Sequence, residues 1–271
     1  MLIQRVITAL ILAPLVIAGI YLLPFPIYAL VFWMLAALGA WEWARLSGLT
    51  TTLAQSAFVA GFALTAALSW WFPASFIVLL WMGAGVWVLA TVLVATYPES
   101  AVLIERGWFS VILGQIMLLV AWVALLVVRS EPDGASWLLW ALLLVWSADI
   151  GAYFAGRRFG HHKLAPAVSP GKTWEGFWGG MAASLMIGGG LLVIVGNDVL
   201  TGEIARALLW VTIIVGLGVI SVIGDLFESV LKRTRGVKDS GNLLPGHGGV
   251  LDRIDSILAV LPLFALILGF V

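Results

Sequence analysis

The sequence predicts an all-α, polytopic integral membrane protein with about nine transmembrane helices. Of its 271 residues, 62% are hydrophobic and 10% are charged, and the mean hydropathy is +1.11. Such values lie far outside those of soluble proteins. Apolar runs of about 20 residues recur along the chain, and each is long enough to cross roughly 30 Å of hydrocarbon. The runs are continuous rather than alternating, which favours helices over a β-barrel.

The expected spans, in order, are 6–23, 25–45, 54–72, 74–96, 107–128, 135–156, 174–196, 204–228 and 251–271. The first is long for a signal peptide and lacks a small-x-small cleavage site, so we expect it to be a retained helix. Tryptophans lie near many span ends, as an interfacial belt would place them: Trp41, Trp43, Trp70, Trp71, Trp108, Trp137 and Trp174. Glu42, between two of them, is interpreted as an interfacial residue. With no cysteine in the chain, disulfides and thiolate metal sites are excluded.

The distribution of basic residues predicts the orientation. With nine spans, twelve of the 14 Lys and Arg residues fall on the face that carries the N-terminus, and only Arg129 and Arg206 fall on the other. The positive-inside rule therefore predicts a cytoplasmic N-terminus. We divide the chain into residues 1–130, a lipid-facing scaffold of five helices, and residues 131–271, four helices that carry a cytoplasm-facing site.

Residues 229–256 concentrate the polar chemistry of the chain. This segment holds five basic residues, three acids, one histidine and five glycines: the basic residues are Lys232, Arg233, Arg235, Lys238 and Arg253. Cations beside acids on a glycine-rich backbone are what a phosphate-and-metal site needs. The turn 245–249 offers backbone N–H groups just before the last helix, and a helix start favours an anion.

Acids inside apolar helices are costly and mark function by default. Asp149 lies seven residues before the inner end of its helix, roughly 10 Å deep, and Asp225 lies seven residues before Lys232, roughly 10 Å from the basic cluster. Asp252 and Asp255 lie in the first two turns of the last helix. Helical spacing gives three polar faces: Ser221, Asp225, Glu228, Ser229 and Lys232; Asp252, Asp255 and Ser256; Asp149 and Tyr153. We expect them to line one cavity open to the cytoplasm. In the alternative interpretation the acids only pair with Arg253, Lys232 or Arg157.

Carboxylates without cysteine favour a hard cation, Mg²⁺ before Zn²⁺. A second polar loop, residues 169–176, lies on the same side, with Ser169 as the expected N-cap of the next helix and Pro170 in its first turn. Its Gly-Lys-Thr is no Walker A loop, because Pro166 stands where that motif needs glycine. Lys172 is nevertheless a candidate phosphate ligand.

Segment 229–256 resembles the signature of the CTP:phosphatidate cytidylyltransferases, the CDP-diacylglycerol synthases. The pattern is met by Ser229, Lys232, Arg233, Lys238, Asp239, Gly241, Pro245, His247, Gly248, Gly249, Asp252, Arg253 and Asp255. The loop 169–176 and the stretch from Asp149 through Tyr153 to Gly156 are also similar to family features. The likeness covers about the last 125 residues.

The resemblance implies transfer of CMP from CTP to phosphatidic acid, giving CDP-diacylglycerol and pyrophosphate, with Mg²⁺ and a second cation such as K⁺. It also implies a homodimer in the bacterial inner membrane and no nucleic-acid partner. The expected catalytic groups are Asp225, Asp252, Lys172, Lys238 and Arg253, and the expected metal ligands are Asp225, Asp252, Asp255 and Asp239. The expected substrate-binding residues are Ser169, Lys232, Arg233, His247, Gly248, Gly249, Asp149, Tyr153 and Ser229.

Two other classes compete with this interpretation. A secondary transporter would use intramembrane acids as a relay, but its sites lie near the midplane between repeated halves, and here the acids are shallow and one-sided. Another lipid-phosphate enzyme, a CDP-alcohol phosphotransferase or a polyprenol kinase, is the second rival. The phosphotransferase motif Asp-Gly-x-x-Ala-Arg is missing, because Asp133-Gly134 continues as Ala135-Ser136-Trp137.

Overall fold

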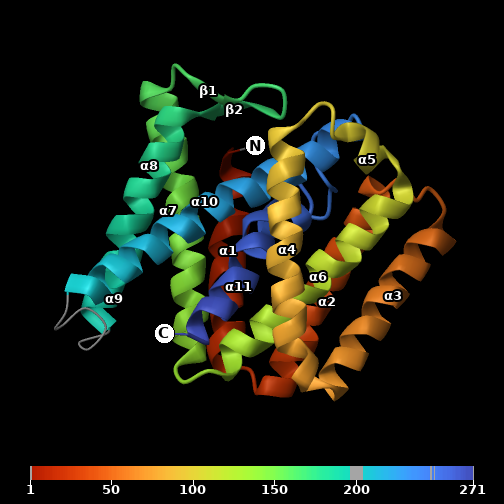
Figure 1. Cartoon of the computed structure of the whole chain (residues 1–271), viewed down its shortest axis with the longest axis horizontal. Helices are drawn as coiled ribbons and strands as arrows, with labels where there is room; N and C mark the ends of the chain where they lie inside the picture. The colour runs from red at the N-terminus through yellow and green to blue at the C-terminus, as the bar shows by residue number, and fades with distance from the viewer. Residues whose placement is uncertain (1, 196–203, 245, 247, 271) are drawn as a thin grey trace.

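The computed structural model describes residues 2–195, 204–244, 246 and 248–270 (Figure 1). Its elements are α1 (Leu2–Leu22), α2 (Phe25–Leu46), α3 (Thr52–Trp71), the 3₁₀ turn η1 (Pro73–Ser75), α4 (Phe76–Ala95), α5 (Ala101–Glu105), α6 (Gly107–Ser130), α7 (Gly134–Phe159), β1 (Lys163–Ala165), β2 (Ser169–Thr173), α8 (Trp174–Ser184), the π-helical turn η2 (Leu185–Gly189), α9 (Gly190–Val195), α10 (Ile204–Thr234) and α11 (Leu251–Leu268). The chain is thus an all-α polytopic membrane protein, as the hydropathy predicts.

Each expected span is occupied by helix. Within the described chain, seven helical segments are long and apolar enough to cross a bilayer: α2, α3, η1 with α4, α6, α7, α8 through η2 into α9, and α10. Helices α1 and α11 occupy the first and last expected spans but fall outside that group. Nine crossings and a cytoplasmic N-terminus therefore stay predictions.

Helix α6 forms the centre of the bundle. It packs against α2, α3, α4, α7 and α11, and most of its residues between Leu113 and Val128 are buried. Here, indole N–H groups of one helix donate hydrogen bonds to backbone carbonyls of another. Trp122 Nε1 of α6 donates to the carbonyl of Ala29 at 3.1 Å, and Trp43 Nε1 of α2 donates to that of Ser110 at 2.9 Å. Such bonds satisfy polar groups that lipid cannot.

The interfacial interpretation was wrong for Trp43. Its side chain is buried, and its ring lies 6.3 Å from that of Phe227 of α10. Trp71 and Trp108 are exposed near helix ends, which is where an interfacial belt would place them. A buried ring and an interfacial ring are indistinguishable by position along one helix, because packing partners come from elsewhere in the chain.

Helices α7 and α8 make the most extensive contact of the molecule. Three glycines of α8 face α7 closely: a Cβ at Gly176 would lie 2.9 Å from the carbonyl oxygen of Ala152, one at Gly179 would lie 3.0 Å from that of Gly151, and one at Gly180 would lie 2.8 Å from that of Ala148. Small residues let helix backbones approach where no hydrophobic effect drives them together.

The connection between these two helices is an antiparallel hairpin of β1 and β2 (Figure 1). The expectation that Ser169 caps the next helix was wrong, because Ser169 pairs with Ala165 in the hairpin. The cap is Thr173, whose Oγ1 accepts a hydrogen bond from Gly176 N at 3.1 Å. Pairing of the loop with β1 keeps it extended until that residue, and this partner strand is not readable from the local motif.

Helix α10 continues six residues beyond its expected end and finishes at Thr234. The first residues of the polar segment are therefore helical. The i,i+4 ion pair of Glu228 with Lys232 supports the added turns, and Gly236 (φ +67°) follows the helix in the left-handed conformation that ends it.

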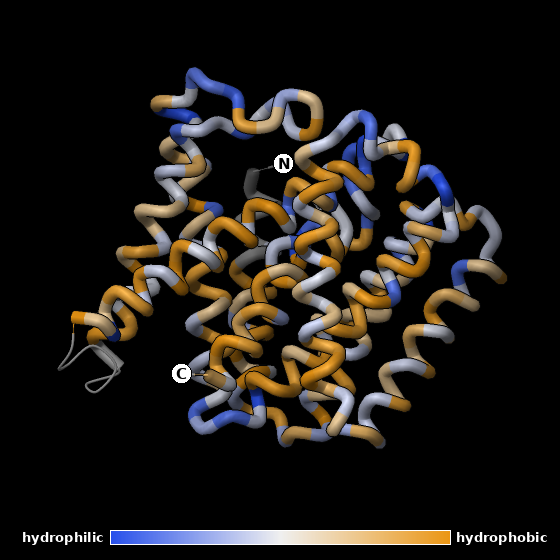
Figure 2. Tube along the Cα trace, viewed as in Figure 1, coloured by the Kyte–Doolittle hydropathy of each residue, from blue (hydrophilic) through white to orange (hydrophobic). Residues whose placement is uncertain are grey.

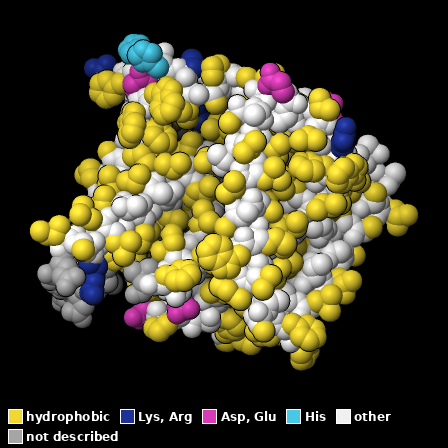
Figure 3. Space-filling model, viewed as in Figure 1, with side chains coloured by type: hydrophobic (Ala, Val, Ile, Leu, Met, Phe, Trp, Pro, Cys, Tyr) yellow, Lys and Arg dark blue, Asp and Glu magenta, His cyan; other side chains and the backbone are white. Residues whose placement is uncertain are grey.

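Polar and apolar residues divide the molecule into zones. Hydrophobic residues run along the helices, and hydrophilic ones gather at the two ends (Figure 2). On the face drawn in Figure 3, the broad middle is covered by apolar side chains, with charged groups above and below it. Large apolar side chains such as Leu68, Trp81 and Val88 are exposed within their helices, where lipid would cover them.

Candidate active site

One cavity of about 630 Å³ collects the polar residues of α7, β2, α10 and α11. Its charged lining consists of Asp149, Arg157, Lys172, Asp225, Lys232, Asp239, Asp252, Arg253 and Asp255. Small and apolar residues complete it, among them Ala152, Phe177, Met181 and Val222. The three polar faces expected from helical spacing therefore do meet around one space.

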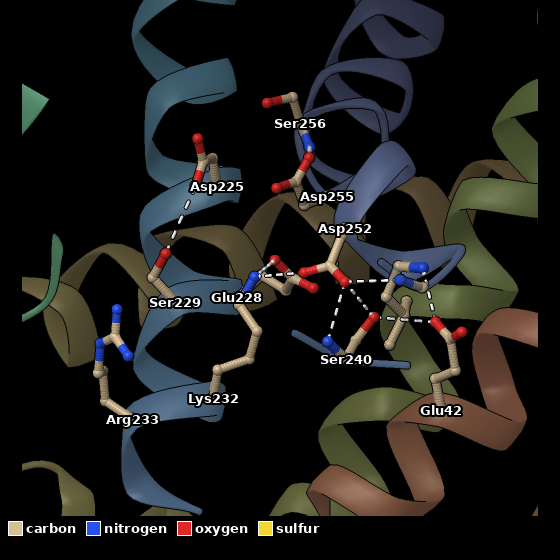
Figure 4. A network of polar contacts seen from close by, with 12 residues as sticks. Glu42, Asp225, Glu228, Ser229, Lys232, Arg233, Ser240, Asp252, Asp255 and Ser256 are labelled. Carbon is tan, nitrogen blue, oxygen red and sulfur yellow. Dashed lines mark hydrogen bonds and ion pairs between the residues drawn. The ribbon is translucent and has the colours of Figure 1, made fainter. Parts of the chain in front are cut away.

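Helix α10 supplies the stripe on one side. Ser221, Asp225 and Lys232 line the cavity. Ser229 is outside the described lining, and its Oγ donates to Asp225 Oδ1 at 3.5 Å. Figure 4 shows Asp225 and Ser229 one above the other on this helix.

The hairpin brings a lysine to this stripe. Lys172 Nζ of β2 lies 2.7 Å from Asp225 Oδ2, and both side chains are partly open. The residues are far apart in the sequence, so the α7–α8 packing that carries the hairpin decides this contact. A cation is thus held beside an acid on the cavity wall, as phosphate binding next to a metal would need.

Asp252 is the most heavily bonded acid of the site. Its Oδ1 accepts from Lys232 Nζ at 2.5 Å. Its Oδ2 accepts from Ser240 N and Oγ, both at 2.9 Å, and from Gly249 N at 2.8 Å. Lys232 is also paired with Glu228 Oε2 at 2.5 Å. The alternative interpretation, in which the acids only pair with basic residues, predicts this pairing of Asp252 with Lys232.

Glu42 is the residue that the sequence interpretation missed. It is 5% exposed, lies near the C-terminal end of α2, and accepts hydrogen bonds from the amides at the start of α11: Oε1 from Val250 N at 3.0 Å and Oε2 from Leu251 N at 2.8 Å. Ser240 Oγ donates to Oε2 at 3.0 Å. An acid inside an apolar span was the available signal, and the neighbouring tryptophans favoured the interfacial interpretation instead.

This geometry corrects the expectation of bare amides at the start of the last helix. The N–H groups of Gly249, Val250 and Leu251 all donate to carboxylates of the chain itself. The helix start does favour an anion, but that anion is the side chain of Glu42 together with Asp252.

Three acids on the cavity wall, Asp149, Asp239 and Asp255, form no salt bridge in the described chain. Asp255 Oδ1 accepts from Ser256 N at 2.7 Å. The charges of Asp149 and Asp255 interact with that of Asp225, and Asp225 and Asp255 project into the space between α10 and α11 (Figure 4). The described cavity wall carries five acids and four basic residues, and Lys172 is bonded to Asp225, so negative charge is in slight excess.

That excess fits a hard cation. Within the part of the chain that the structure describes, no three Asp, Glu, His or Cys side chains come close enough to hold a metal by themselves. A cation between Asp225 and Asp255 would therefore complete its shell with water and substrate oxygens, which is how Mg²⁺ is usually bound.

The other expected site residues are distributed as follows. Arg253, Asp239 and Tyr153 line the cavity, whereas Lys238 is exposed and, like Ser169, is outside the described lining. The hydroxyl of Tyr153 accepts from Arg157 at 2.9 Å.

Arg233 lies away from the cavity, and its Nε donates to the carbonyl of Val168 at 3.2 Å, which ties the hairpin to α10. Gly248 has a left-handed backbone (φ +82°), and a Cβ there would lie 2.7 Å from Asp252 Oδ2. His247 lies outside the described residues.

Comparisons with known proteins identify the family of this chain. The sequence profile described as "Cytidylyltransferase family" matches residues 3–271. A protein of Pseudomonas aeruginosa named phosphatidate cytidylyltransferase is 45% identical over 99% of this chain and 97% of its own length. A protein of the same name from Haemophilus influenzae is 38% identical and covers all of both chains. A third, from Staphylococcus haemolyticus, is 48% identical over 51% of each chain. This chain belongs to the cytidylyltransferase family.

Proposed function

We propose that this protein transfers the CMP group of CTP to phosphatidic acid, which gives CDP-diacylglycerol and pyrophosphate in phospholipid biosynthesis. The observation that carries the proposal is a single cavity in a membrane-spanning bundle where acids and bases of α7, β2, α10 and α11 meet. The names of the relatives support the same activity.

The chemistry asks for positioning rather than for a strong base. A phosphate oxygen of phosphatidic acid, already ionised near neutral pH, attacks the α-phosphorus of CTP. A new P–O bond forms while the bond to the bridging oxygen of the β-phosphate breaks, and pyrophosphate leaves with the electron pair. The difficulty is to bring two polyanions together and to stabilise charge on the leaving group.

Residues of the cavity wall suit these tasks. Lys172 and Arg253 are the cations that would bind phosphate oxygens. Arg253 has no carboxylate partner in the described chain, so its charge is available to substrate. Lys232 is already bonded to two carboxylates and would act by fixing Asp252.

Magnesium is part of this proposal. Asp225 and Asp255 would hold it, with Asp149 close by, and a second cation such as K⁺ would lie toward Asp252 and Asp239. A bound divalent cation would neutralise phosphate charge and align the two substrates.

The cellular setting is also proposed. The end of the bundle that carries the hairpin would face the cytoplasm, where CTP is present, in a bacterial inner membrane. The one-sided basic residues support this orientation, and the relatives are bacterial proteins. A homodimer belongs to the same proposal and rests on the family resemblance.

Pyrophosphate release by purified protein in detergent tests the activity. We expect release only when CTP and phosphatidic acid are both present, loss of release in EDTA and recovery with Mg²⁺. Asp225→Asn should lower kcat at least about tenfold, because it removes a ligand charge from the cavity wall.

Asp133→Asn is the matched control, since Asp133 lies in the α6–α7 connection and adopts a left-handed conformation (φ 55°) that Asn tolerates. Pyrophosphate release without phosphatidic acid, or release that persists in EDTA, would contradict the proposal. So would equal rates for the two variants.

A further inference from the structure

The carboxylate of Glu42 is built into the start of α11. Three donors surround it: the amides of Val250 and Leu251, and the hydroxyl of Ser240. A buried carboxylate is costly unless it is hydrogen-bonded, and a helix N-terminus is where its charge is most favourable. This acid comes from α2, in the half of the chain expected to be scaffold.

The backbone around Glu42 leaves no room for anything else. A Cβ on Gly249 would lie 2.5 Å from both carboxylate oxygens, and one on Gly241 would overlap Oε1. Both glycines belong to the polar segment that carries the site. Residues 240, 241 and 249–251 therefore pack around this one side chain.

Hydrogen bonds continue from Glu42 into the cavity. Ser240 Oγ lies 3.0 Å from Glu42 Oε2 and 2.9 Å from Asp252 Oδ2 (Figure 4). A hydroxyl has one proton, so the two carboxylates share it. Asp252 in turn holds Lys232 at 2.5 Å. Loss of the Glu42 acceptor would release the start of α11 and let Ser240 donate to Asp252 alone.

We propose that Glu42 is a positioning residue for the cytidylyltransferase reaction: it fixes the first turn of α11 and, through Ser240, the orientation of Asp252 and Lys232 on the cavity wall. The inference rests on the proposed function. Glu42 touches no substrate in this scheme and acts only through these neighbours.

Glu42→Gln tests the idea with little change of shape. The amide keeps one acceptor oxygen, and its NH₂ group faces donors that need an acceptor. We expect kcat to fall about 10- to 100-fold, as for other residues that orient a ligand, with KM for CTP changing less than kcat because Lys172, on the hairpin, is untouched. Hydrogen exchange should quicken at Val250 and Leu251 while the amides of α6 stay protected.

Glu105→Gln is the matched control. Glu105 is an exposed glutamate at the end of α5, and its side chain accepts no hydrogen bond from the described residues. We expect this variant to keep the parent kcat and exchange pattern.

Ser240→Ala gives a second route to the same question if Glu42→Gln unfolds. It removes the shared hydroxyl but keeps the two amide bonds of Glu42, so we expect a smaller loss of kcat. In the double variant the losses should not multiply, since both act through Asp252.

An active parent with an equally active Glu42→Gln would overturn the positioning role and leave the proposed activity intact. Faster exchange throughout the bundle, or losses that multiply in the double variant, would also overturn it. A parent with no cytidylyltransferase activity would instead overturn the proposed function and this role with it.

Discussion

At the scale of single residues, Lys232 is the basic residue that forms ion pairs with two buried acids beside the cavity. Its ammonium lies between Glu228 and Asp252, and all three side chains are at most 12% exposed. Glu228 Oε1 is buried and has no hydrogen-bond partner in the described chain. Because two buried carboxylates share this one ammonium group, its removal would leave both charges uncompensated.

We therefore predict that Lys232→Met destabilises the protein by about 3–5 kcal/mol, because it leaves the buried carboxylates of Glu228 and Asp252 without a basic partner. Thermal unfolding in detergent measures the effect. Lys163→Met, on the exposed hairpin strand β1, is the matched control and should unfold like the parent. Equal unfolding temperatures for the two variants would show that the buried ion pairs do not stabilise the fold.

Most of the acids on the cavity wall were predictable from the sequence, and Glu42 was not. Asp149, Asp225, Asp252 and Asp255 stand out as charges within apolar helices that reach a similar depth. Glu42 has the same signal, but its partners follow about 200 residues later. Nothing near it in the sequence indicates a helix start to cap.

At the scale of elements, the approach of α8 to α7 positions the hairpin. The glycine face of α8 packs on α7, and Thr173 caps the helix directly after β2. Lys172 therefore reaches Asp225 only while the two helices remain in close contact. The sequence analysis took the second strand of the hairpin for the first turn of a helix.

Gly180→Val should separate these helices. Its Cβ would lie 2.8 Å from the carbonyl oxygen of Ala148, and overpacking of this kind costs about 1–3 kcal/mol. We expect a lower unfolding temperature and a higher KM for CTP, because Lys172 moves away from the cavity wall. Gly190→Val is the control, since a Cβ there meets nothing within 4 Å. If both variants match the parent in KM, α7–α8 packing does not position Lys172.

At the scale of the whole molecule, the helical bundle has two polar ends. The hairpin lies at one end and the α6–α7 connection at the other (Figure 1). Charged side chains gather at these ends and leave the apolar belt between them (Figure 3). A membrane around that belt separates the hairpin from the α6–α7 connection.

Because the chain has no cysteine, single-cysteine variants can test the proposed orientation. With a cytoplasmic site, a membrane-impermeant maleimide should label Pro132→Cys in spheroplasts and His161→Cys only after permeabilisation. Both positions are exposed, at opposite ends of α7. The reverse pattern would place the candidate site outside and contradict access to cytoplasmic CTP.

The sequence by itself determined the membrane class, the helical spans and the acids that meet in one cavity, because hydropathy and helical periodicity are local properties of the chain. It also carried the motif that shows the family. Tertiary structure alone decided that Lys172 pairs with Asp225, that Asp252 is held by Lys232 and that Glu42 caps α11. Those contacts join groups from distant helices, and which charges neutralise each other inside a bundle depends on how closely its helices pack.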